Sequence, residues 1–178
     1  MFFEAKLLKE LTLEPRFMGK KVREMVHERL KDAVEGKLVP NVGFVVTVLR
    51  ITDDWMGTGL IDNLTGGSVY KVPYEAIVFR PFKNEVLDVI VTSVNNYGFQ
   101  GSVGGMFKVF VHKSNMPMSN PEDPQKFEDE AWVSLDGSTQ IKKDCGVRLR
   151  VITVKFHADR IDGVGNIKDH YCGLIFVS

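Results

Sequence analysis

Aromatic and basic side chains interleave in one stretch of the sequence, YGFQGSVGGMFKVFVHKS, which spans residues 97–114. Aromatic rings offer flat surfaces on which nucleic-acid bases stack, and lysine side chains neutralise phosphates. Stacking contributes roughly 1–3 kcal/mol per base and tolerates any base. The glycines and short apolar runs of this stretch predict two adjacent strands joined by a turn. The sequence therefore predicts a nucleic-acid-binding surface on a β-hairpin.

Side-chain alternation predicts which residues share a face, because residues two apart on a strand point to the same side. Lys108, Phe110 and His112 then share one face of the second strand. By the same rule Tyr97 and Phe99 are expected to point the same way, as are two arginines on a later strand. The candidate nucleic-acid contacts are Tyr97, Phe99, Gln100, Lys108, Phe110, His112, Arg148 and Arg150.

Other roles for these residue types must be weighed against binding. Phe99 and Phe110 would each also suit the interior of a barrel, and the sequence leaves both interpretations open. His112 lies two residues from a serine, but no acidic partner is evident that would complete a catalytic triad. His170 and Cys172 have no second pair of ligands for zinc. We therefore expect no catalytic residue, no cofactor and no metal in this chain.

The hairpin belongs to a series of short predicted strands that starts after Pro81. Five strands are expected, at residues 85–94, 99–104, 108–114, 147–157 and 163–168. Five strands at this spacing suggest a closed OB barrel, whose second and third strands form the usual oligonucleotide face. Residues 116–140 carry three prolines and six acidic residues against one lysine, and are expected to form a long acidic loop between the third and fourth strands.

The first half of the chain predicts a separate domain that mixes strands with one helix. Residues 2–13 are rich in apolar residues and are expected to form a strand that Pro15 ends. Apolar residues then recur at helical spacing, and Gly36 stands where a helix C-terminus favours glycine. Runs rich in β-branched residues follow, so the element order describes a sheet covered by a single helix. The segment FRPFKNEV is the expected joint between residues 1–80 and residues 81–178.

Charge and composition limit the classes of function. The formal net charge is zero, which excludes strong bulk attraction to nucleic acid or to an anionic membrane. From residue 81 onward, outside the acidic segment, ten lysines and arginines stand against six acidic residues, so the barrel is mildly basic. Two distant cysteines without a CxxC motif fit a reducing compartment. No apolar run approaches the roughly 20 residues that a membrane helix needs.

The hairpin resembles a known RNA-binding module. YGFQGSVGGMFKVFVHKS is similar to the second and third strands of the RNA-binding OB barrel of the ribosomal S-one type, from its aromatic-glycine start to its VHxS end. Gln100 stands where that module usually carries a second exposed aromatic, and Val109 replaces a usual glycine. The resemblance implies RNA binding, which these two departures make weak and tolerant of sequence.

A longer resemblance covers nearly the whole chain. GTGLIDNLTGGSVYKVPYEAIVFRPFKNEVLDVIVTSVNNYGF is similar to the central segment of the stalk-subunit family of eukaryotic nuclear RNA polymerases. The match is closest to the seventh-subunit branch of RNA polymerase II, a branch that also has a counterpart in the archaeal polymerase. LTLEPRFMG, VEGK and IKDHYCGLI resemble the same family at the same relative places.

That family resemblance implies a non-catalytic nuclear subunit with two domains. The first is a truncated ribonucleoprotein-like tip domain that docks on the polymerase core, and the second is the OB barrel. The implied partners are the fourth subunit of polymerase II, the core with its largest subunit, and single-stranded nascent RNA near the RNA exit channel. The implied role is support of transcription initiation. The core-docking tip would be built from Pro15, Arg16, Phe17, Gly19, Asp62, Asn63, Gly66 and Gly67.

Two alternatives stay open at the level of sequence. LVPNVGF and EDEAWV resemble the paralogous stalk subunit of RNA polymerase III, whereas the short final hairpin FHADRIDGVGNIKD favours polymerase II. A free-standing OB-fold RNA-binding protein would share the barrel and lack the tip domain. Trp55 lies near the expected tip and has no assigned role.

Overall fold

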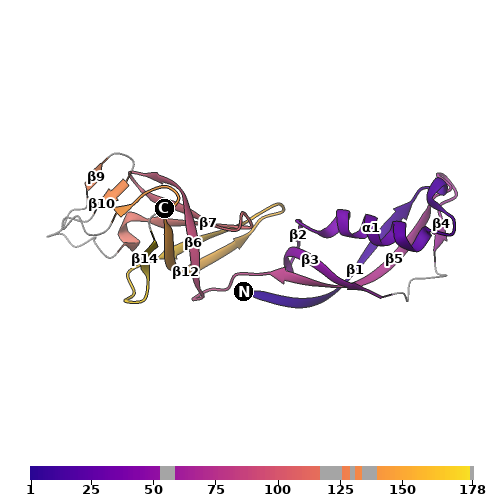
Figure 1. Ribbon diagram of the computed structural model, residues 1–178, viewed down its shortest axis with the longest axis horizontal. Helices are drawn as coiled ribbons and strands as arrows, with labels where there is room; N and C mark the ends of the chain where they lie inside the picture. Colours follow the sequence, from indigo (N-terminus) through magenta and orange to yellow (C-terminus); the bar gives the residue numbers. More distant parts are fainter. Residues whose placement is uncertain (53–58, 117–125, 129–130, 134–139, 177–178) are drawn as a thin grey trace. The chain divides into compact units, whose positions relative to one another are not determined.

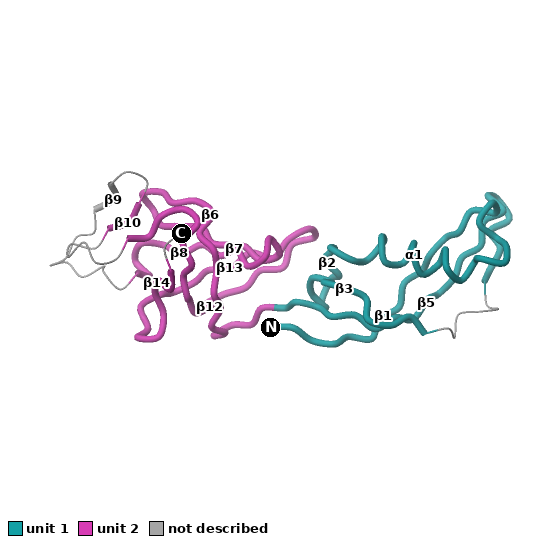
Figure 2. The backbone as a smooth tube through the Cα atoms, in the orientation of Figure 1, with its two compact units in different colours: residues 1–80 teal, residues 81–178 magenta. Residues whose placement is uncertain are grey.

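The chain folds into two compact units, Met1–Arg80 and Pro81–Ser178 (Figure 2). A computed structural model describes residues 1–52, 59–116, 126–128, 131–133 and 140–176 (Figure 1). Trp55, which the sequence places near the tip, lies outside the described residues. Among the described residues, no helix is long and apolar enough to cross a membrane.

The first unit is built on an antiparallel sheet with strand order β1-β5-β3-β2, and β4 pairs with the start of β5. Its strands are β1 (Phe2–Leu13), β2 (Leu38–Val39), β3 (Gly43–Ile51), β4 (Leu60–Ile61) and β5 (Ser68–Phe79). The two longest strands, β1 and β5, pair along their whole length, from Phe2 opposite Phe79 to Leu13 opposite Ser68. A short 3-10 turn, η1 (Pro15–Phe17), follows β1 directly. The ends of β1 and β4 therefore lie on either side of the start of β5.

One helix, α1 (Val22–Val34), covers one face of this sheet, as the sequence predicts (Figure 1). Its buried side chains Val26, Leu30 and Val34 join the core with alternate residues of the strands, such as Val72. Their helical spacing produces this apolar stripe, and burial of each side chain contributes about 1.5–3 kcal/mol. Gly36 follows the helix with a φ of +72°, a conformation that glycine adopts without strain.

The second unit is a closed five-stranded barrel, which confirms the OB-type fold expected from the sequence. Its strands follow the order β13-β8-β7-β6-β12, and β12 pairs back with β13 to close the sheet. The strands are β6 (Val86–Asn95), β7 (Gly98–Val103), β8 (Phe107–His112), β12 (Gly146–Phe156) and β13 (Ile161–Asn166). A further strand, β14 (Gly173–Phe176), pairs with the start of β12. The 3-10 turn η3 (Lys113–Asn115) follows β8.

The barrel interior is filled from alternate positions of each strand. Phe107, Val109 and Val111 of β8 are fully buried, as is Leu149 of β12. A Cβ atom added at Gly163 of β13 would lie 2.5 Å from the Phe107 ring, so glycine lets that ring fit inside the barrel. The intervening residues of β8 are thereby fixed on the outer surface.

The acidic segment at residues 116–140 is not a loop throughout, and the expectation of a loop is wrong for its described part. β9 (Lys126–Glu128), β10 (Ala131–Val133) and β11 (Gln140–Ile141) form a small antiparallel sheet. Ala131 and Trp132 are buried, and the Trp132 indole Nε1 donates a hydrogen bond to the carbonyl of Asn95 at 3.1 Å. Burial of these two apolar side chains favours an ordered sheet here, although the segment as a whole is rich in acidic residues. Met116 is also buried, and residues 117–125, 129–130 and 134–139 lie outside the described part of the chain.

Candidate nucleic-acid interface and tip

The outward-facing residues of β7, β8 and β13 form one continuous surface. Gln100 of β7 lies opposite Phe110 of β8, and β13 runs parallel to β8 with Val164 beside Phe110. One step along the same strands, Lys108 lies between Ser102 and Asp162. These residues point outward because their neighbours on β8 are buried in the barrel. The structure therefore brings together Gln100, Lys108 and Phe110, as the sequence predicts.

A shallow hollow of about 310 Å³ lies on this surface. It is lined by Gln100, Lys108, Phe110, Arg160, Asp162 and Gly163. The half-buried Phe110 ring supplies an apolar wall, and Lys108 supplies an exposed cation beside it. An aromatic wall next to a cation fits a base and its phosphate.

Two polar residues of this hollow, Arg160 and Asp162, were missed by the reasoning from sequence. Arg160 Nε lies 3.0 Å from Asp162 Oδ2, and His157 Nε2 lies 3.4 Å from the same oxygen. Lys155 stands opposite Asp162 across the β12–β13 pair. One carboxylate is thus surrounded by basic groups, and the rim of the hollow keeps an excess of positive charge. The signal that would have identified these residues is the parallel pairing of β13 with β8, which no local pattern reveals.

His112 ends β8 on the same outward row as Phe110, with the two ring centroids 6.4 Å apart. Its Nδ1 atom lies 2.6 Å from the hydroxyl of Ser114 and accepts a hydrogen bond from the Ser114 backbone at 3.2 Å. The ring thereby caps η3, which begins at the next residue. Its orientation is fixed by the turn that follows the strand.

The prediction that Tyr97 and Phe99 point the same way is wrong. Phe99 is completely buried in the barrel and offers no surface for a base, whereas Tyr97 is 69% exposed. Tyr97 lies in the turn before β7, where the Asn95 side chain accepts hydrogen bonds from the backbone N–H groups of Tyr97 and Gly98. Strand alternation does not extend across that turn, because β7 begins at Gly98. Tyr97 therefore remains a candidate RNA contact, and Phe99 is a core residue.

The structure does not bring Arg148 and Arg150 onto the β7–β8 surface. Both lie on β12, which pairs with β6 on one side and with β13 on the other, and so borders neither β7 nor β8. Arg148 forms a two-point ion pair with Asp88 of β6, at 2.6 and 2.9 Å. Arg150 lies 3.0 Å from Asp169. Both guanidinium groups are engaged by carboxylates, so the RNA contacts proposed for them gain no support from this geometry.

The predicted tip residues come from two loops that the structure places side by side in the first unit. Gly66 and Gly67 precede β5, and a Cβ atom added at Gly66 would lie 3.5 Å from the Pro15 ring. Arg16 and Arg29 lie on the Phe17 ring, 4.7 and 5.3 Å from its centroid. Gly19 follows η1 and accepts a hydrogen bond from Val22 at the start of α1.

The β4–β5 loop is held in shape by Asp62. Its carboxylate accepts hydrogen bonds from the Thr65 hydroxyl at 2.7 Å and from the Leu64 backbone at 3.1 Å. The hydrogen bond from Thr65 lowers the pKa of Asp62, with the Leu64 backbone acting in the same direction. The Asp62 backbone also exchanges hydrogen bonds with Gly66 and Gly67. Asp62 therefore shapes the loop, and Asn63 is an exposed turn residue within it.

Strand β4 and the loop that follows it present apolar side chains to solvent. Leu60, Ile61 and Leu64 are 71, 67 and 96% exposed. Sequence reasoning placed the loop from Asp62 to Gly67 at the tip without singling out Leu64, and it did not include Leu60 or Ile61. Clustered exposed apolar side chains at a rigid loop are typical of protein–protein contact.

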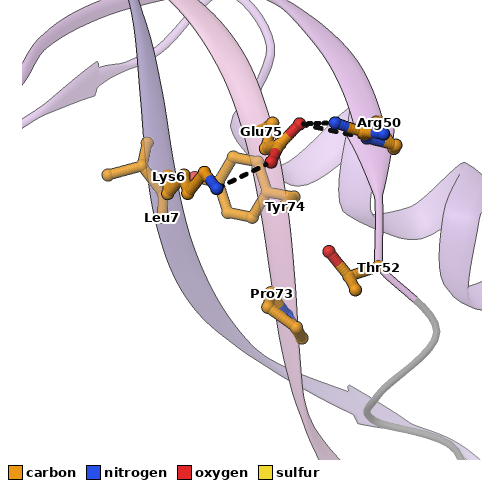
Figure 3. Close-up of a pocket in the computed structure, with 7 residues that line it drawn as sticks. All are labelled: Lys6, Leu7, Arg50, Thr52, Pro73, Tyr74 and Glu75. Carbon is orange, nitrogen blue, oxygen red and sulfur yellow. Dashed lines mark hydrogen bonds and ion pairs between the residues drawn. The ribbon is translucent and has the colours of Figure 1, made fainter.

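A second hollow of about 350 Å³ lies on the first unit, on the sheet where β1, β5 and β3 run side by side (Figure 3). Lys6, Glu75 and Arg50 lie opposite one another there. Arg50 donates two hydrogen bonds to Glu75 Oε2, at 2.7 and 3.0 Å, and Lys6 Nζ lies 3.4 Å from Oε1. The hydrogen bond from Arg50 is the main reason that the pKa of Glu75 is lowered. This row of charges is satisfied within the sheet.

Among the described residues there is no candidate metal site, because no three His, Cys, Asp or Glu side chains lie close enough together to hold an ion. His170 and Cys172, which share a short stretch of sequence, belong to no such group in that part of the chain.

Comparisons with known proteins match both units. Residues 9–58 match the family described as the SHS2 domain found in the N terminus of Rpb7p/Rpc25p/MJ0397, and residues 80–163 match the S1 RNA binding domain. DNA-directed RNA polymerase II subunit 7 of Arabidopsis thaliana is 38% identical over 98% of this chain and 97% of its own length. Subunit RPB7 of Saccharomyces cerevisiae is 32% identical over 98% of this chain and 100% of its own. Subunit Rpo7 of Sulfolobus acidocaldarius is 23% identical, with coverage of 92 and 87%.

Proposed function

This chain belongs to the family of RNA polymerase II subunit 7, and from that membership we propose that it is a non-catalytic stalk subunit of DNA-directed RNA polymerase II. The observation that carries the proposal is the extent of the similarity. Relatives at 32–38% identity match 98% of the chain, so the likeness covers both units and the joint between them. A free-standing RNA-binding barrel would not be expected to carry the first unit. The proposed location is the nucleus, where polymerase II works.

The barrel supports an RNA-binding role within that assembly. Its S1-type fold places Lys108, Phe110 and His112 on one outward row, with Arg160 at the edge of the same hollow. Single-stranded RNA is the ligand that this combination of one aromatic wall and several cations fits best. The proposed ligand is nascent RNA leaving the polymerase. One half-buried aromatic and a neutral net charge favour weak, sequence-tolerant binding.

The first unit supports a docking role. The β4–β5 loop lies beside η1, with Gly66 near Pro15, and β4 and this loop expose Leu60, Ile61 and Leu64 on a backbone that Asp62 holds in shape. We assign the polymerase core, including its largest subunit, as the partner of this tip. A second stalk subunit, the fourth subunit of polymerase II, is the other proposed partner. Attachment of the chain beside the RNA exit would support transcription initiation.

Affinity purification of the tagged chain from its own cells tests this function, with mass spectrometry of the proteins recovered. The proposal expects the largest polymerase II subunits and one small stalk partner. Recovery of polymerase III subunits instead would assign the chain to the paralogous enzyme and leave both surfaces as described. Recovery of ribosomal or other RNA-binding proteins without any polymerase would overturn the stalk assignment.

A further inference from the structure

Asp162 is an acidic residue in a hollow whose other charged side chains, Lys108 and Arg160, are basic. It lies directly opposite Lys108 where β13 pairs with β8, within the candidate RNA surface. A carboxylate repels the phosphates of RNA, so Asp162 opposes the attraction that the two cations supply. A surface that recognised only phosphates would bind RNA more tightly without this residue.

Only one of the two carboxylate oxygens of Asp162 holds neighbouring side chains. Arg160 Nε donates a hydrogen bond to Oδ2 at 3.0 Å, and His157 Nε2 lies 3.4 Å from the same atom. Within the described ranges, no residue donates a hydrogen bond to Oδ1. The side chain is 33% exposed and lines the hollow, so Oδ1 is an acceptor that a ligand can use. The contact with Arg160 therefore orients the carboxylate without occupying it fully.

Two neighbouring side chains in the hollow suit a nucleic-acid base. The half-buried ring of Phe110 offers a stacking surface. Gln100 lies opposite Phe110 across the β7–β8 pair, and its side-chain amide can both donate and accept hydrogen bonds. The hollow, of about 310 Å³, is large enough for a single base. A ring, an amide and a carboxylate together can recognise the edge of a base as well as its flat face.

The four RNA bases differ in what their Watson–Crick edges offer a carboxylate. Guanine presents two adjacent donors, N1–H and N2–H, which match the two oxygens of one carboxylate, and its O6 accepts beside them. Oδ2 retains a lone pair for this contact, because each carboxylate oxygen accepts two hydrogen bonds. Adenine and cytosine each present one donor next to an accepting ring nitrogen, and the N–H of uracil lies between two carbonyl oxygens. Those acceptors would face the negative charge of Asp162.

We propose that Asp162 is a specificity-determining residue that selects guanine at one position of a bound single-stranded RNA. Its carboxylate accepts the N1–H and N2–H groups, the Gln100 amide donates to O6, and the base stacks on Phe110. The inference rests on the RNA-binding function proposed above and adds a base preference to it. Contacts elsewhere on the surface remain tolerant of sequence, so the preference is limited to the base in the hollow.

Fluorescence anisotropy with three short labelled oligonucleotides tests this preference on the full chain. One is oligouridine, the second carries a single central guanine, and the third carries inosine, which lacks the N2 amino group, at that position. A single guanine avoids the four-stranded structures that runs of guanine form. The native chain is expected to bind the guanine oligonucleotide roughly fivefold or more tightly than oligouridine, the lower end of the discrimination that a two-point contact to a base provides. Inosine should recover only part of this gain.

Asp162→Asn separates recognition of the base from general electrostatics. It removes the negative charge and one acceptor, so the ratio of guanine to oligouridine affinity should fall towards one, while affinity for oligouridine stays the same or rises. Asp88→Asn is the matched control, because Asp88 also pairs with an arginine of the barrel and does not line the hollow. It removes the same charge and should leave the ratio unchanged. Thermal melting checks the folding of both variants, and the inosine comparison needs no variant.

Equal affinity of the native chain for the guanine and uridine oligonucleotides would overturn the inference, as would full affinity for the inosine oligonucleotide. A uniform loss of affinity in Asp162→Asn, with the ratio unchanged, would mean that Asp162 only holds Arg160 in place. A ratio that falls in Asp162→Asn and not in Asp88→Asn would support selection of guanine. If the native chain binds none of the three oligonucleotides, the RNA-binding function itself fails, and the base preference fails with it.

Discussion

Arg148 donates hydrogen bonds to both carboxylate oxygens of Asp88, from Nε at 2.6 Å and from Nη2 at 2.9 Å. The two residues lie directly opposite each other on β12 and β6, so the pair crosses two neighbouring strands of the barrel. The hydrogen bond from Arg148 is the main reason that the pKa of Asp88 is lowered. A guanidinium held in this way is already satisfied, and its strand β12 borders β6 and β13, not β7 or β8.

Replacement of Arg148 by alanine is therefore expected to act on Asp88 and to leave RNA affinity nearly unchanged. Without its partner, the Asp88 pKa should rise towards its usual value of 3.8. Because the folded-state pKa is lowered, the pair stabilises the protein above that value and loses its effect as the pH falls through the folded pKa. NMR titration of the carboxyl carbons measures the shift. A large loss of RNA affinity in Arg148→Ala would instead restore this arginine to the RNA surface.

Phe110 and Phe99 are expected to respond in opposite ways to truncation. Phe110→Ala removes an outward ring, so RNA affinity should fall roughly 5- to 150-fold, which corresponds to 1–3 kcal/mol of stacking. Phe99→Ala removes a fully buried ring and should lower the free energy of unfolding by about 3–5 kcal/mol. Chemical denaturation and fluorescence anisotropy with oligouridine give the two quantities. If Phe110→Ala binds RNA normally and is the less stable of the two variants, the assignment of the outward face is wrong.

The salt dependence of RNA affinity should report contacts from Lys108 and Arg160. Each phosphate neutralised on a single strand contributes about −0.7 to the slope of log K against log salt concentration. Lys108→Gln and Arg160→Gln should each make the slope shallower by up to that amount. Lys31→Gln, on the exposed side of α1 in the other unit, is the matched control and should leave the slope unchanged. Equal slopes for all three variants would remove Lys108 and Arg160 from the phosphate contacts.

The strands of the barrel could be predicted because each has its own local pattern. Period-two alternation located β8, and its buried set of Phe107, Val109 and Val111 follows directly from it. The same rule failed one strand earlier, because Tyr97 lies in a turn and not on β7. Gly98 has a φ of +153° there, and an added Cβ atom would clash with the Val111 carbonyl. The inward–outward alternation of side chains is interrupted at a turn, and where it resumes depends on backbone geometry that the residue pattern does not reveal.

Contacts between residues on strands that are far apart in the sequence could not be predicted from local patterns. Arg160 and Asp162 join the candidate RNA surface only because β13 closes the barrel against β8. The carboxylate partners of Arg148 and Arg150 likewise come from other parts of the chain. The sequence alone therefore suggested that both arginines could bind RNA, whereas each forms an ion pair within the barrel unit. At the tip, the turn residues could be recognised from the sequence as a loop. The exposed leucines beside them could not, because the sequence does not distinguish an exposed leucine from a buried one.

Trp132 is expected to anchor the small β9–β11 sheet to the barrel. Trp132→Phe keeps most of the buried ring and removes the hydrogen bond to the Asn95 carbonyl. The free energy of unfolding should fall by roughly 0.5–1.5 kcal/mol, the net value of one such bond. Hydrogen exchange should quicken at Ile141, which lies opposite Trp132, more than at Val109 in the barrel core. Uniform exchange changes across the barrel would mean that the segment is not a separate unit of stability.

Leu64 is expected to be the main apolar contact of the tip. It is 96% exposed, and Asp62 and Thr65 hold the loop that presents it, so little ordering is needed when a partner covers it. Leu64→Ser should leave the melting temperature unchanged, because a side chain in solvent contributes nothing to the core. Full burial of a leucine contributes about 1.5–3 kcal/mol, so affinity for the polymerase core should fall by roughly 10- to 150-fold.

Leu49→Ser on β3, a leucine that is 52% exposed in the same unit, is the matched control. Quantitative recovery of the largest polymerase subunit with each variant decides the matter. Equal recovery with Leu64→Ser and the native chain would remove the β4–β5 loop from the docking surface, whereas a loss confined to Leu49→Ser would move that surface onto the sheet.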